Sequence, residues 1–341
     1  MRIILFGFGV VGQNLAKLFL SRGDDLYANY GMKPRIVAVL DKKGYAISQL
    51  GLDLEKLLEV KRVKGSVHGY EGADKKGLND DLNIDELLAS VDAECLVEVT
   101  PTNLKTGEPS LSYITSAMRY GKNVVTANKG PLALAFPSLI ELADYNNVKL
   151  KFSATVGGGT PILEFAKHCL KGDSIASLRG ILNGTTNYIL TKMEEGLEFE
   201  EALEDARVKG YAEADPSLDI DGYDPAAKLV IMANWIMNRK VTLNDVKFTG
   251  IRNVKRDEIK KLLDRGSTIK LIAECNEELS VMPREVNKDD PLCVNGTLNA
   301  VTFLSEHSGE LTIIGRGAGG IETASAILRD LIEIREELSK H

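Results

Sequence analysis

The sequence has few cysteines, no strongly basic run and no long uninterrupted apolar stretch. Its four cysteines lie far apart and form no CxxC pair: Cys95, Cys169, Cys275 and Cys293. This spacing argues against a zinc site and against a disulfide framework, and it is typical of proteins from reducing compartments. No stretch reaches the roughly 20 apolar residues of a membrane span. We therefore expect no membrane partner.

Charge and the N-terminus restrict the partners and location further. The net charge is -7, from 42 basic and 49 acidic residues, so no basic surface for nucleic acid is predicted. Residues 1–20 are apolar enough to imitate a secretion signal, but Gln13, Asn14 and Lys17 interrupt them, and no small-residue cleavage site follows. These features predict a cytoplasmic protein that binds a small molecule rather than nucleic acid.

The first 150 residues alternate short apolar runs with amphipathic ones. The expected strands are residues 2–6, 36–40, 95–99, 123–126 and 147–154, and the expected helices include 10–20 and 111–120. This alternation predicts an α/β fold with a Rossmann-like, doubly wound parallel sheet.

The pattern changes after residue 155. Helices are predicted over 161–170, over 224–237 with Asp224 as N-cap, and over 321–338; strands are predicted over 269–274, 300–304 and 311–314. A chain of 341 residues is long enough for two domains. We expect an NAD(P)-binding domain of residues 1–154 plus about 305–341, and an α+β domain for substrate binding and dimerisation over 155–304.

A glycine-rich turn joins the first strand to the first helix, with the sequence Gly7-Phe8-Gly9-Val10-Val11-Gly12. The first glycine permits a tight turn, the second lets the backbone approach a pyrophosphate, and the third lets helix and strand pack closely. The helix N-terminus then presents unpaired N–H groups to the phosphates. The turn predicts a dinucleotide cofactor.

The residues after the second strand leave the choice of cofactor open. Asp41 would hydrogen-bond to the 2′-hydroxyl of NAD, although it lies 29 residues beyond Gly12 rather than about 20. Lys42 and Lys43 follow at once and could meet the 2′-phosphate of NADP. Both NAD and NADP remain possible at this point.

The stretch from Gly210 to Lys228 combines acids with a lysine. Residues 217–222 imitate the start of a calcium loop, but the position of the closing glutamate is Lys228, which would repel the ion. Lys228 lies four residues after Asp224, so both side chains project from one face of a helical turn. A lysine opposes the dipole at a helix N-terminus, which makes Lys228 a candidate functional residue.

Several motifs together resemble homoserine dehydrogenase. They are Asn183-Gly184-Thr185-Thr186-Asn187-Tyr188-Ile189-Leu190, the Gly210-to-Lys228 stretch with Gly-Tyr-Ala-Glu-Ala-Asp-Pro, Thr126-Ala127-Asn128-Lys129, Ala154-Thr155-Val156-Gly157-Gly158-Gly159, and Gly315-Arg316-Gly317-Ala318-Gly319. The resemblance extends from residue 1 to about 331. It implies reversible, NAD(P)H-dependent reduction of L-aspartate 4-semialdehyde to L-homoserine, on the route to threonine, methionine and isoleucine.

The resemblance also assigns roles to residues. It implies that Lys228 and Lys129 lie near the reacting group, with Asp224 orienting Lys228. The implied substrate-binding residues are Glu213, Asp219, Tyr211, Gly184 and Thr185; Thr185 could at the same time cap a helix. Thr100, Pro101, Lys129 and Gly317 are the implied cofactor neighbours beyond the glycine turn.

Further properties follow from the resemblance alone. Backbone carbonyls of Val156 and Gly158 would hold a sodium or potassium ion, although Ser153 stands where relatives often carry an acid. A homodimer is expected, in a short form without a C-terminal regulatory domain.

Two other functions are compatible with parts of the sequence. An aspartate-semialdehyde dehydrogenase needs an activated thiolate at a turn, whereas Cys95 begins a predicted strand and Cys169 lies in a helical pattern. A non-catalytic NAD(P)-binding sensor would keep the glycine turn but would have no use for Lys129, Glu213 and Lys228 together.

Overall fold

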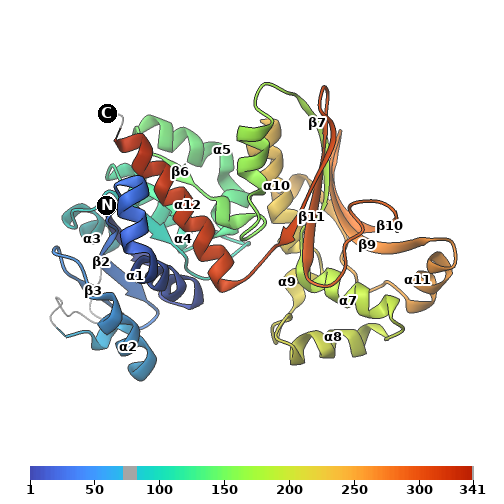
Figure 1. Cartoon of the computed structure of the whole chain (residues 1–341), viewed down its shortest axis with the longest axis horizontal. Coiled ribbons are helices and arrows are strands. Elements are labelled where there is room, and N and C mark those ends of the chain that lie inside the picture. The colour runs from blue at the N-terminus through green and yellow to red at the C-terminus, as the bar shows by residue number, and fades with distance from the viewer. Residues whose placement is uncertain (72–82, 340–341) are drawn as a thin grey trace. The chain divides into compact units, whose positions relative to one another are not determined.

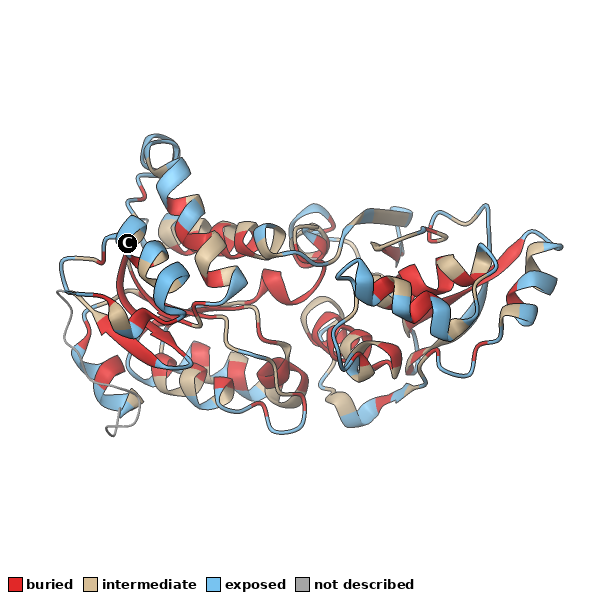
Figure 2. Cartoon of the chain, turned by 90° about the horizontal axis from the view of Figure 1, so that it is seen from below, coloured by how far each residue is buried: buried red, intermediate tan, exposed pale blue. Residues whose placement is uncertain are grey.

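The computed structural model describes residues 1–71 and 83–339, which divide into two units. Unit 1 comprises Met1–Pro131, Pro137–Thr155 and Gly320–His341, and unit 2 comprises Leu132–Phe136 and Val156–Gly319. In unit 1 the strands are largely buried, while the helices carry exposed residues on their outer sides (Figure 2).

Unit 1 is built on a six-stranded sheet with the order β3-β2-β1-β4-β5-β6. The strands are β1 (Arg2–Phe6), β2 (Arg35–Asp41), β3 (Gly44–Ile47), β4 (Cys95–Glu98), β5 (Asn123–Thr126) and β6 (Leu150–Lys151). All neighbours pair in parallel except β3, which is antiparallel to β2. The predicted Rossmann-like sheet is thus confirmed. The strand order reverses beside β1, and a ligand of such a sheet binds at the carboxyl ends of the strands there.

Helices cover this sheet, and the last helix of the chain joins them. They are α1 (Val10–Tyr30), α2 (Leu54–Lys64), α3 (Ile84–Ser90), α4 (Ser110–Arg119), α5 (Lys129–Tyr145) and α12 (Gly320–Leu338). Helix α12 lies beside α1 (Figure 1), and Leu15, Phe19, Ile327 and Leu331 belong to one buried cluster. Burial of such side chains stabilises by roughly 1.5–3 kcal/mol each, so the C-terminal helix is an integral part of unit 1.

Unit 2 contains a second six-stranded sheet, with the order β12-β11-β7-β9-β10-β8. Its strands are β7 (Ile175–Ile181), β8 (Val246–Phe248), β9 (Ser267–Cys275), β10 (Leu279–Asn287), β11 (Leu298–Ser305) and β12 (Gly309–Arg316). Only the β8–β10 pair is parallel. The helices are α6 (Ile162–Glu164), α7 (Gly184–Glu194), α8 (Phe199–Val208), α9 (Ser217–Ile220), α10 (Tyr223–Met237) and α11 (Arg256–Leu263). Segregated helices on a mainly antiparallel sheet are the predicted α+β arrangement.

The division of the chain differs from the prediction at its end. The chain returns to unit 1 at Gly320 rather than near residue 305. The reason is that β12 pairs with β11 along its whole length, from Leu298–Arg316 to Ser305–Gly309. The predicted strand over 147–154 is also shorter, because Ser153 donates its backbone N–H and its hydroxyl to Asp330 of α12 instead of to a neighbouring strand.

Helix α10 begins two residues earlier than predicted. Gly222 is its N-cap and adopts a left-handed φ of 92°, which glycine takes at little cost. The prediction that Asp224 is the N-cap is therefore wrong, and Asp224 lies in the first turn instead. The predicted helix over 161–170 is divided into α6 and a π-helical segment, Phe165–Cys169.

None of the helices among residues 1–71 and 83–339 is sufficiently long and apolar to cross a membrane.

Candidate functional site

The glycine turn of unit 1 has the geometry of a dinucleotide cradle. Gly7 has a φ of 100°, and a Cβ atom there would lie 2.5 Å from the Val99 carbonyl oxygen. A Cβ on Gly12 would lie 2.3 Å from the carbonyl oxygen of Gly7. At Gly9 a Cβ would meet nothing within 4 Å, so the space above this residue is open. Two glycines are required by packing, and the third leaves room for a ligand to approach the backbone.

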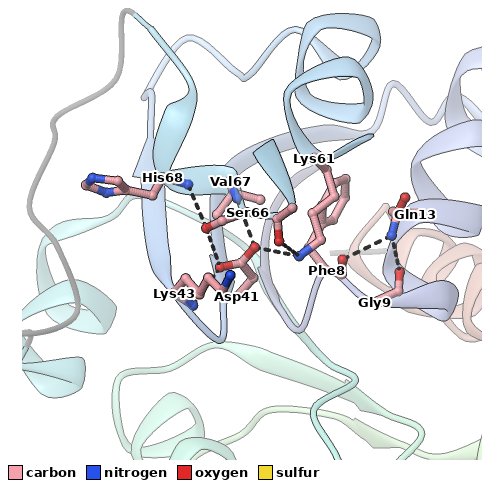
Figure 3. A network of polar contacts seen from close by, with 10 residues as sticks. Phe8, Gly9, Gln13, Asp41, Lys43, Lys61, Ser66, Val67 and His68 are labelled. Atoms are coloured by element: carbon pink, nitrogen blue, oxygen red, sulfur yellow. Dashed lines mark hydrogen bonds and ion pairs between the residues drawn. The ribbon is translucent and has the colours of Figure 1, made fainter. Parts of the chain in front are cut away.

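The first turn of α1 has no side-chain cap. Gly9 is its N-cap, and neither Val10 nor Val11 is acidic. The amide of Gln13 donates to the carbonyl oxygens of Phe8 and Gly9, at 3.3 and 3.1 Å, and so holds the backbone of the turn in place (Figure 3). The uncapped N–H groups and the helix dipole are suited to an anionic group.

Asp41 ends β2 and is bound by groups of the chain itself. Its carboxylate accepts hydrogen bonds from Lys61 Nζ at 2.7 Å and from the N–H groups of Lys43 and Val67, each at 2.9 Å (Figure 3). Burial alone would raise the pKa of Asp41, but the hydrogen bonds from Lys61, Lys43 and Val67 outweigh it and lower that pKa. Lys42 is exposed. Asp41 is therefore ionised, and these hydrogen bonds hold its carboxylate in place.

A buried glutamate lies at the end of β4, and the sequence interpretation missed it. Glu98 is fully buried and accepts hydrogen bonds from Ser110 Oγ at 2.5 Å, Thr126 Oγ1 at 2.9 Å and the Thr100 N–H at 2.9 Å. Burial raises its pKa, although these hydrogen bonds oppose the shift. The one signal in the sequence was an acid inside an otherwise apolar run, Cys95–Glu98.

The Glu98 network holds the turn that contains Thr100 and Pro101. Asn128 Nδ2 donates to the carbonyl oxygens of both residues at 3.3 Å, while its Oδ1 accepts from Gly130 and caps α5. Lys129, the first residue of α5, is half-buried. The ends of β4 and β5 are thereby fixed to each other at the carboxyl edge of the sheet.

Unit 2 contains a compact cluster of two carboxylates, an amide and a lysine. Lys228 is buried; its Nζ lies 2.7 Å from Asp224 Oδ2 and donates to the Leu182 carbonyl oxygen at 2.6 Å. Asn183 Nδ2 donates to Asp219 Oδ1 at 2.6 Å and to Asp224 Oδ2 at 2.9 Å. The structure thus brings together Asp219, Asp224 and Lys228, which the sequence interpretation had singled out, and adds Asn183.

The electrostatics of this cluster favour a cation as its ligand. Burial and the neighbouring charge of Asp224 raise the pKa of Asp219, while Asn183 and Lys228 oppose the shift. Two carboxylates here share one lysine ammonium. A second positive group placed beside Asp219 would relieve this excess of negative charge.

The other predicted substrate-binding residues lie around the start of α7. Asn183 caps this helix by accepting from the Thr186 N–H at 2.9 Å. A Cβ on Gly184 would lie 2.8 Å from the Thr297 carbonyl oxygen, and Thr185 Oγ1 donates to the Tyr211 carbonyl oxygen at 2.8 Å. Asn183 is therefore the cap, and Thr185 is not.

Glu213 is the exception among the predicted substrate-binding residues. It is exposed and forms no hydrogen bond or ion pair with any residue that the structure describes.

The glycine-rich segment Gly315–Gly319 packs against the segment that follows residue 155. A Cβ on Gly158 would lie 3.0 Å from the Gly317 carbonyl carbon, and one on Gly317 would lie 2.0 Å from Asn299 Nδ2. Gly157 and Gly158 both have positive φ, 82° and 54°. These contacts give Gly317 a packing reason to be glycine and place it beside Gly158.

Three of the four cysteines lack the properties of an activated thiolate. All four are free, and Cys95 and Cys275 are buried. Burial raises the pKa of the Cys95, Cys275 and Cys293 thiols, which is the opposite of activation. Cysteine-based acyl transfer, one of the alternative functions, therefore has little support.

Comparison with known proteins identifies the family. The family model "Homoserine dehydrogenase, NAD binding domain" matches residues 7–153, and the model "Homoserine dehydrogenase" matches residues 161–332. A homoserine dehydrogenase of Methanocaldococcus jannaschii is 47% identical to this chain over 100% of both sequences. The chain belongs to the homoserine dehydrogenase family. The resemblance found in the motifs is thus confirmed, and the chain is an NAD(P)-dependent oxidoreductase that acts on a small molecule.

The descriptions of relatives in this family name different cofactors. An NAD(+)-dependent homoserine dehydrogenase of Pseudomonas canavaninivorans is 39% identical over 99% of this chain and 97% of its own length. The solved structure of a hyperthermophilic archaeal homoserine dehydrogenase in complex with NADPH has a TM-score of 0.85 and 29% identity, and covers 98% of both chains. The family thus confirms the prediction of NAD or NADP as the cofactor. Which of the two this chain prefers depends on its own residues.

Proposed function

We propose that this chain interconverts L-aspartate 4-semialdehyde and L-homoserine with NAD(P)H, and that Lys228 is its central catalytic residue. The observation that carries this role is the position of the Lys228 ammonium, which is buried between Asp224 Oδ2 and the Leu182 carbonyl oxygen. An ammonium has three N–H donors, and these two contacts use two of them. The third is free for the oxygen of a substrate.

The residues of unit 1 fit the cofactor that the family requires. The open space above Gly9 and the uncapped start of α1 would hold the pyrophosphate. The turn containing Thr100 and Pro101, held by Glu98 and Asn128, would lie against the nicotinamide ring, with Lys129 beside it. When bound, NAD(P)H supplies the hydride that reduces the aldehyde carbon.

Lys228 acts on the oxygen of the reacting group. Negative charge develops on the aldehyde oxygen as the carbon is reduced, and a positioned ammonium stabilises that charge and donates a proton. In the reverse direction the same nitrogen accepts the proton of the homoserine hydroxyl. Asp224 orients the side chain, because its carboxylate holds the ammonium from the same face of α10.

Asp219 is the proposed partner of the substrate's ammonium. Burial and the neighbouring charge of Asp224 raise its pKa, and the amino group of homoserine would compensate that negative charge. Glu213 and Tyr211 would contribute at the exposed side of the same cluster. The substrate carboxylate would meet the N–H groups of Gly184 and Thr185 at the start of α7.

We also propose a homodimer in the cytoplasm. Leu304 and Ile314 are 41% and 49% exposed, and both lie on the same face of the second sheet, because Ile314 pairs with Ala300, four residues before Leu304. Large exposed apolar side chains on a sheet face are suited to burial against a second copy.

The free cysteines agree with a reducing compartment. The carbonyls of Val156 and Gly158 remain the proposed ligands of a monovalent cation.

The function is tested by turnover in a chain without thiols. A variant with Cys95, Cys169, Cys275 and Cys293 all replaced by alanine should oxidise NADPH with aspartate 4-semialdehyde at a rate within about twofold of the native chain, because no step uses sulfur. Absence of turnover in the native chain would contradict the assignment and would favour a cofactor-binding sensor. Activity in the native chain alone, with the variant folded but inactive, would favour a cysteine-dependent reductase.

A further inference from the structure

The segment that carries Glu213 is an exposed connection between α8 and α9. It starts at Gly210, which has a φ of 74° and no neighbour within 4 Å of the position that a Cβ would take. The N–H groups of Tyr211 and Ala212 both donate to the Ala206 carbonyl oxygen, at 2.8 and 3.2 Å. These two bonds attach the start of the segment to the end of α8. The direction in which the segment then presents Glu213 depends on what holds Tyr211.

Helix α7 holds Tyr211 by both its backbone and its ring. Thr185 Oγ1 donates to the Tyr211 carbonyl oxygen at 2.8 Å. One turn further along α7, the ring of Tyr188 packs against that of Tyr211, with 4.8 Å between the ring centroids and an angle of 57° between the planes. Residues three apart share one face of a helix, so Thr185 and Tyr188 contact Tyr211 from the same side. Tyr188 is 7% exposed and Tyr211 is 45% exposed, so Tyr188 forms the buried base on which Tyr211 rests.

The hydroxyl of Tyr188 is fixed in turn by two charged residues at the end of α8. Tyr188 Oη donates to Asp205 Oδ2 at 2.5 Å and accepts from Lys209 Nζ at 2.7 Å, and Lys209 Nζ lies 2.9 Å from the same Asp205 oxygen. An ammonium can only donate hydrogen bonds, so the Tyr188 proton is directed at Asp205. Hydrogen bonds from Tyr188 and Lys209 lower the pKa of Asp205, and those to Tyr188 and Asp205 raise the pKa of Lys209. Both partners are therefore charged at neutral pH, and each member of this triangle contacts the other two.

The Tyr188–Asp205–Lys209 triangle lies at the point where the chain leaves α8. Lys209 is the C-cap of that helix and directly precedes Gly210. Helices α7 and α8 pack side by side (Figure 1), and the triangle fixes the last turn of α8 to the first half of α7. Phenylalanine would fill the same space between the two helices as tyrosine does. The buried hydroxyl therefore contributes to position rather than to packing.

We propose that Tyr188 is a positioning residue for recognition of the substrate's amino group, and that it acts through Tyr211 on the place of Glu213. The inference rests on the proposed function, in which Glu213 contributes to binding that amino group. Tyr188 itself touches neither substrate nor cofactor. Lys228 is held separately, by Asp224 and a backbone carbonyl oxygen, so the hydroxyl of Tyr188 affects how tightly homoserine binds and not how fast it reacts.

Steady-state kinetics of Tyr188→Phe with homoserine as the varied substrate test the inference. The cofactor, at saturation, is whichever of NAD⁺ and NADP⁺ gives the higher rate with the native chain. KM for homoserine should rise about fivefold, the factor expected for one hydrogen bond, while kcat and the KM for the cofactor stay within about twofold. Asp205→Asn, which removes the charge that holds the hydroxyl, should raise KM in the same direction. Tyr145→Phe is the matched control: Tyr145 is 87% exposed, and the loss of its hydroxyl should change neither constant.

A double variant distinguishes positioning from a general loosening of the fold. Glu213→Gln alone should raise KM for homoserine. Its effect should largely disappear in the Tyr188→Phe background, because both changes act through Glu213. Effects of two independent residues would multiply instead.

Each contrary outcome has a distinct meaning. Unchanged KM in Tyr188→Phe, in a chain that oxidises homoserine, would overturn the inference and leave the proposed function intact. If Tyr188→Phe does not fold, an unchanged KM in Asp205→Asn overturns the inference by itself. Multiplying effects of Tyr188→Phe and Glu213→Gln would overturn it as well, because Tyr188 would then act independently of Glu213. If the native chain does not oxidise homoserine, the proposed function fails and the inference fails with it.

Discussion

At the scale of single residues, Asp219 combines a cost in stability with its proposed role in substrate binding. Burial and Asp224 raise its pKa above the ordinary value of 3.8. The folded chain therefore binds this proton more tightly than the unfolded chain. The resulting penalty is absent below the unfolded pKa, grows as the pH rises through the folded pKa, and is fully present at neutral pH.

Replacing Asp219 by asparagine separates these two effects. At pH 8 we expect Asp219→Asn to raise Tm by about 2 °C, because the penalty disappears. The same change should raise KM for homoserine at least about tenfold, because the partner of the substrate's ammonium is lost.

The pH profile provides the check on this account. In the native chain kcat/KM for homoserine should fall as the pH drops through the raised pKa of Asp219, and the variant should lack that limb. A variant with lower Tm and unchanged KM would show that Asp219 is only a structural residue.

At the scale of elements, the turn between β1 and α1 depends on backbone packing. The Cβ of an alanine at position 12 would overlap the Gly7 carbonyl oxygen, 2.3 Å away. We expect Gly12→Ala to cost about 1–3 kcal/mol of stability and to weaken NADPH binding more than about tenfold, since the turn must shift.

Gly23 provides a matched control in the same helix. A Cβ there would meet nothing within 4 Å, so Gly23→Ala should stabilise by about 0.5–1 kcal/mol through helix propensity. Chemical denaturation and NADPH fluorescence titration measure both effects. Equal behaviour of the two variants would contradict the packing described for Gly12.

The sequence predicted those elements that have a local signature. The parallel strands β1, β2, β4 and β5 are short runs dominated by apolar or β-branched residues, and the glycine turn has its own pattern. Helix α8 and strand β10 were not predicted, because charged residues dominate the first, and Pro283, Arg284 and Glu285 interrupt the second. Strand β10 is defined instead by its antiparallel pairing with the preceding strand β9, from Leu279–Cys275 to Asn287–Ser267.

In the candidate site, too, the sequence did not reveal contacts between residues that are far apart in the chain. Spacing alone placed Asp224 and Lys228 on one helical face, and the structure has them 2.7 Å apart. Asn183 and Glu98 were missed as polar links, since their partners Asp219 and Ser110 lie 36 and 12 residues away. The hydrogen bonds of Asp41 could not be foreseen either, because Lys61 and Ser66 reach it only after α2 has folded against β2.

At the scale of the whole molecule, the chain combines two chemistries in separate units. Unit 1 contains the glycine turn with the Glu98 network, and unit 2 contains the lysine–carboxylate cluster. Family membership extends over both, since the two family models match residues 7–153 and 161–332. A variant of unit 2 should therefore lose turnover and keep the binding of NADPH.

The most direct test of the central claim is steady-state turnover of Lys228→Ala with aspartate 4-semialdehyde and NADPH. The matched control is Lys247→Ala, which removes an exposed lysine that is also paired with a carboxylate, Glu278. We predict that kcat of Lys228→Ala falls by about 10²- to 10⁴-fold, while NADPH affinity stays within about twofold and Lys247→Ala matches the native chain. Undiminished kcat in a folded Lys228→Ala chain would contradict the account.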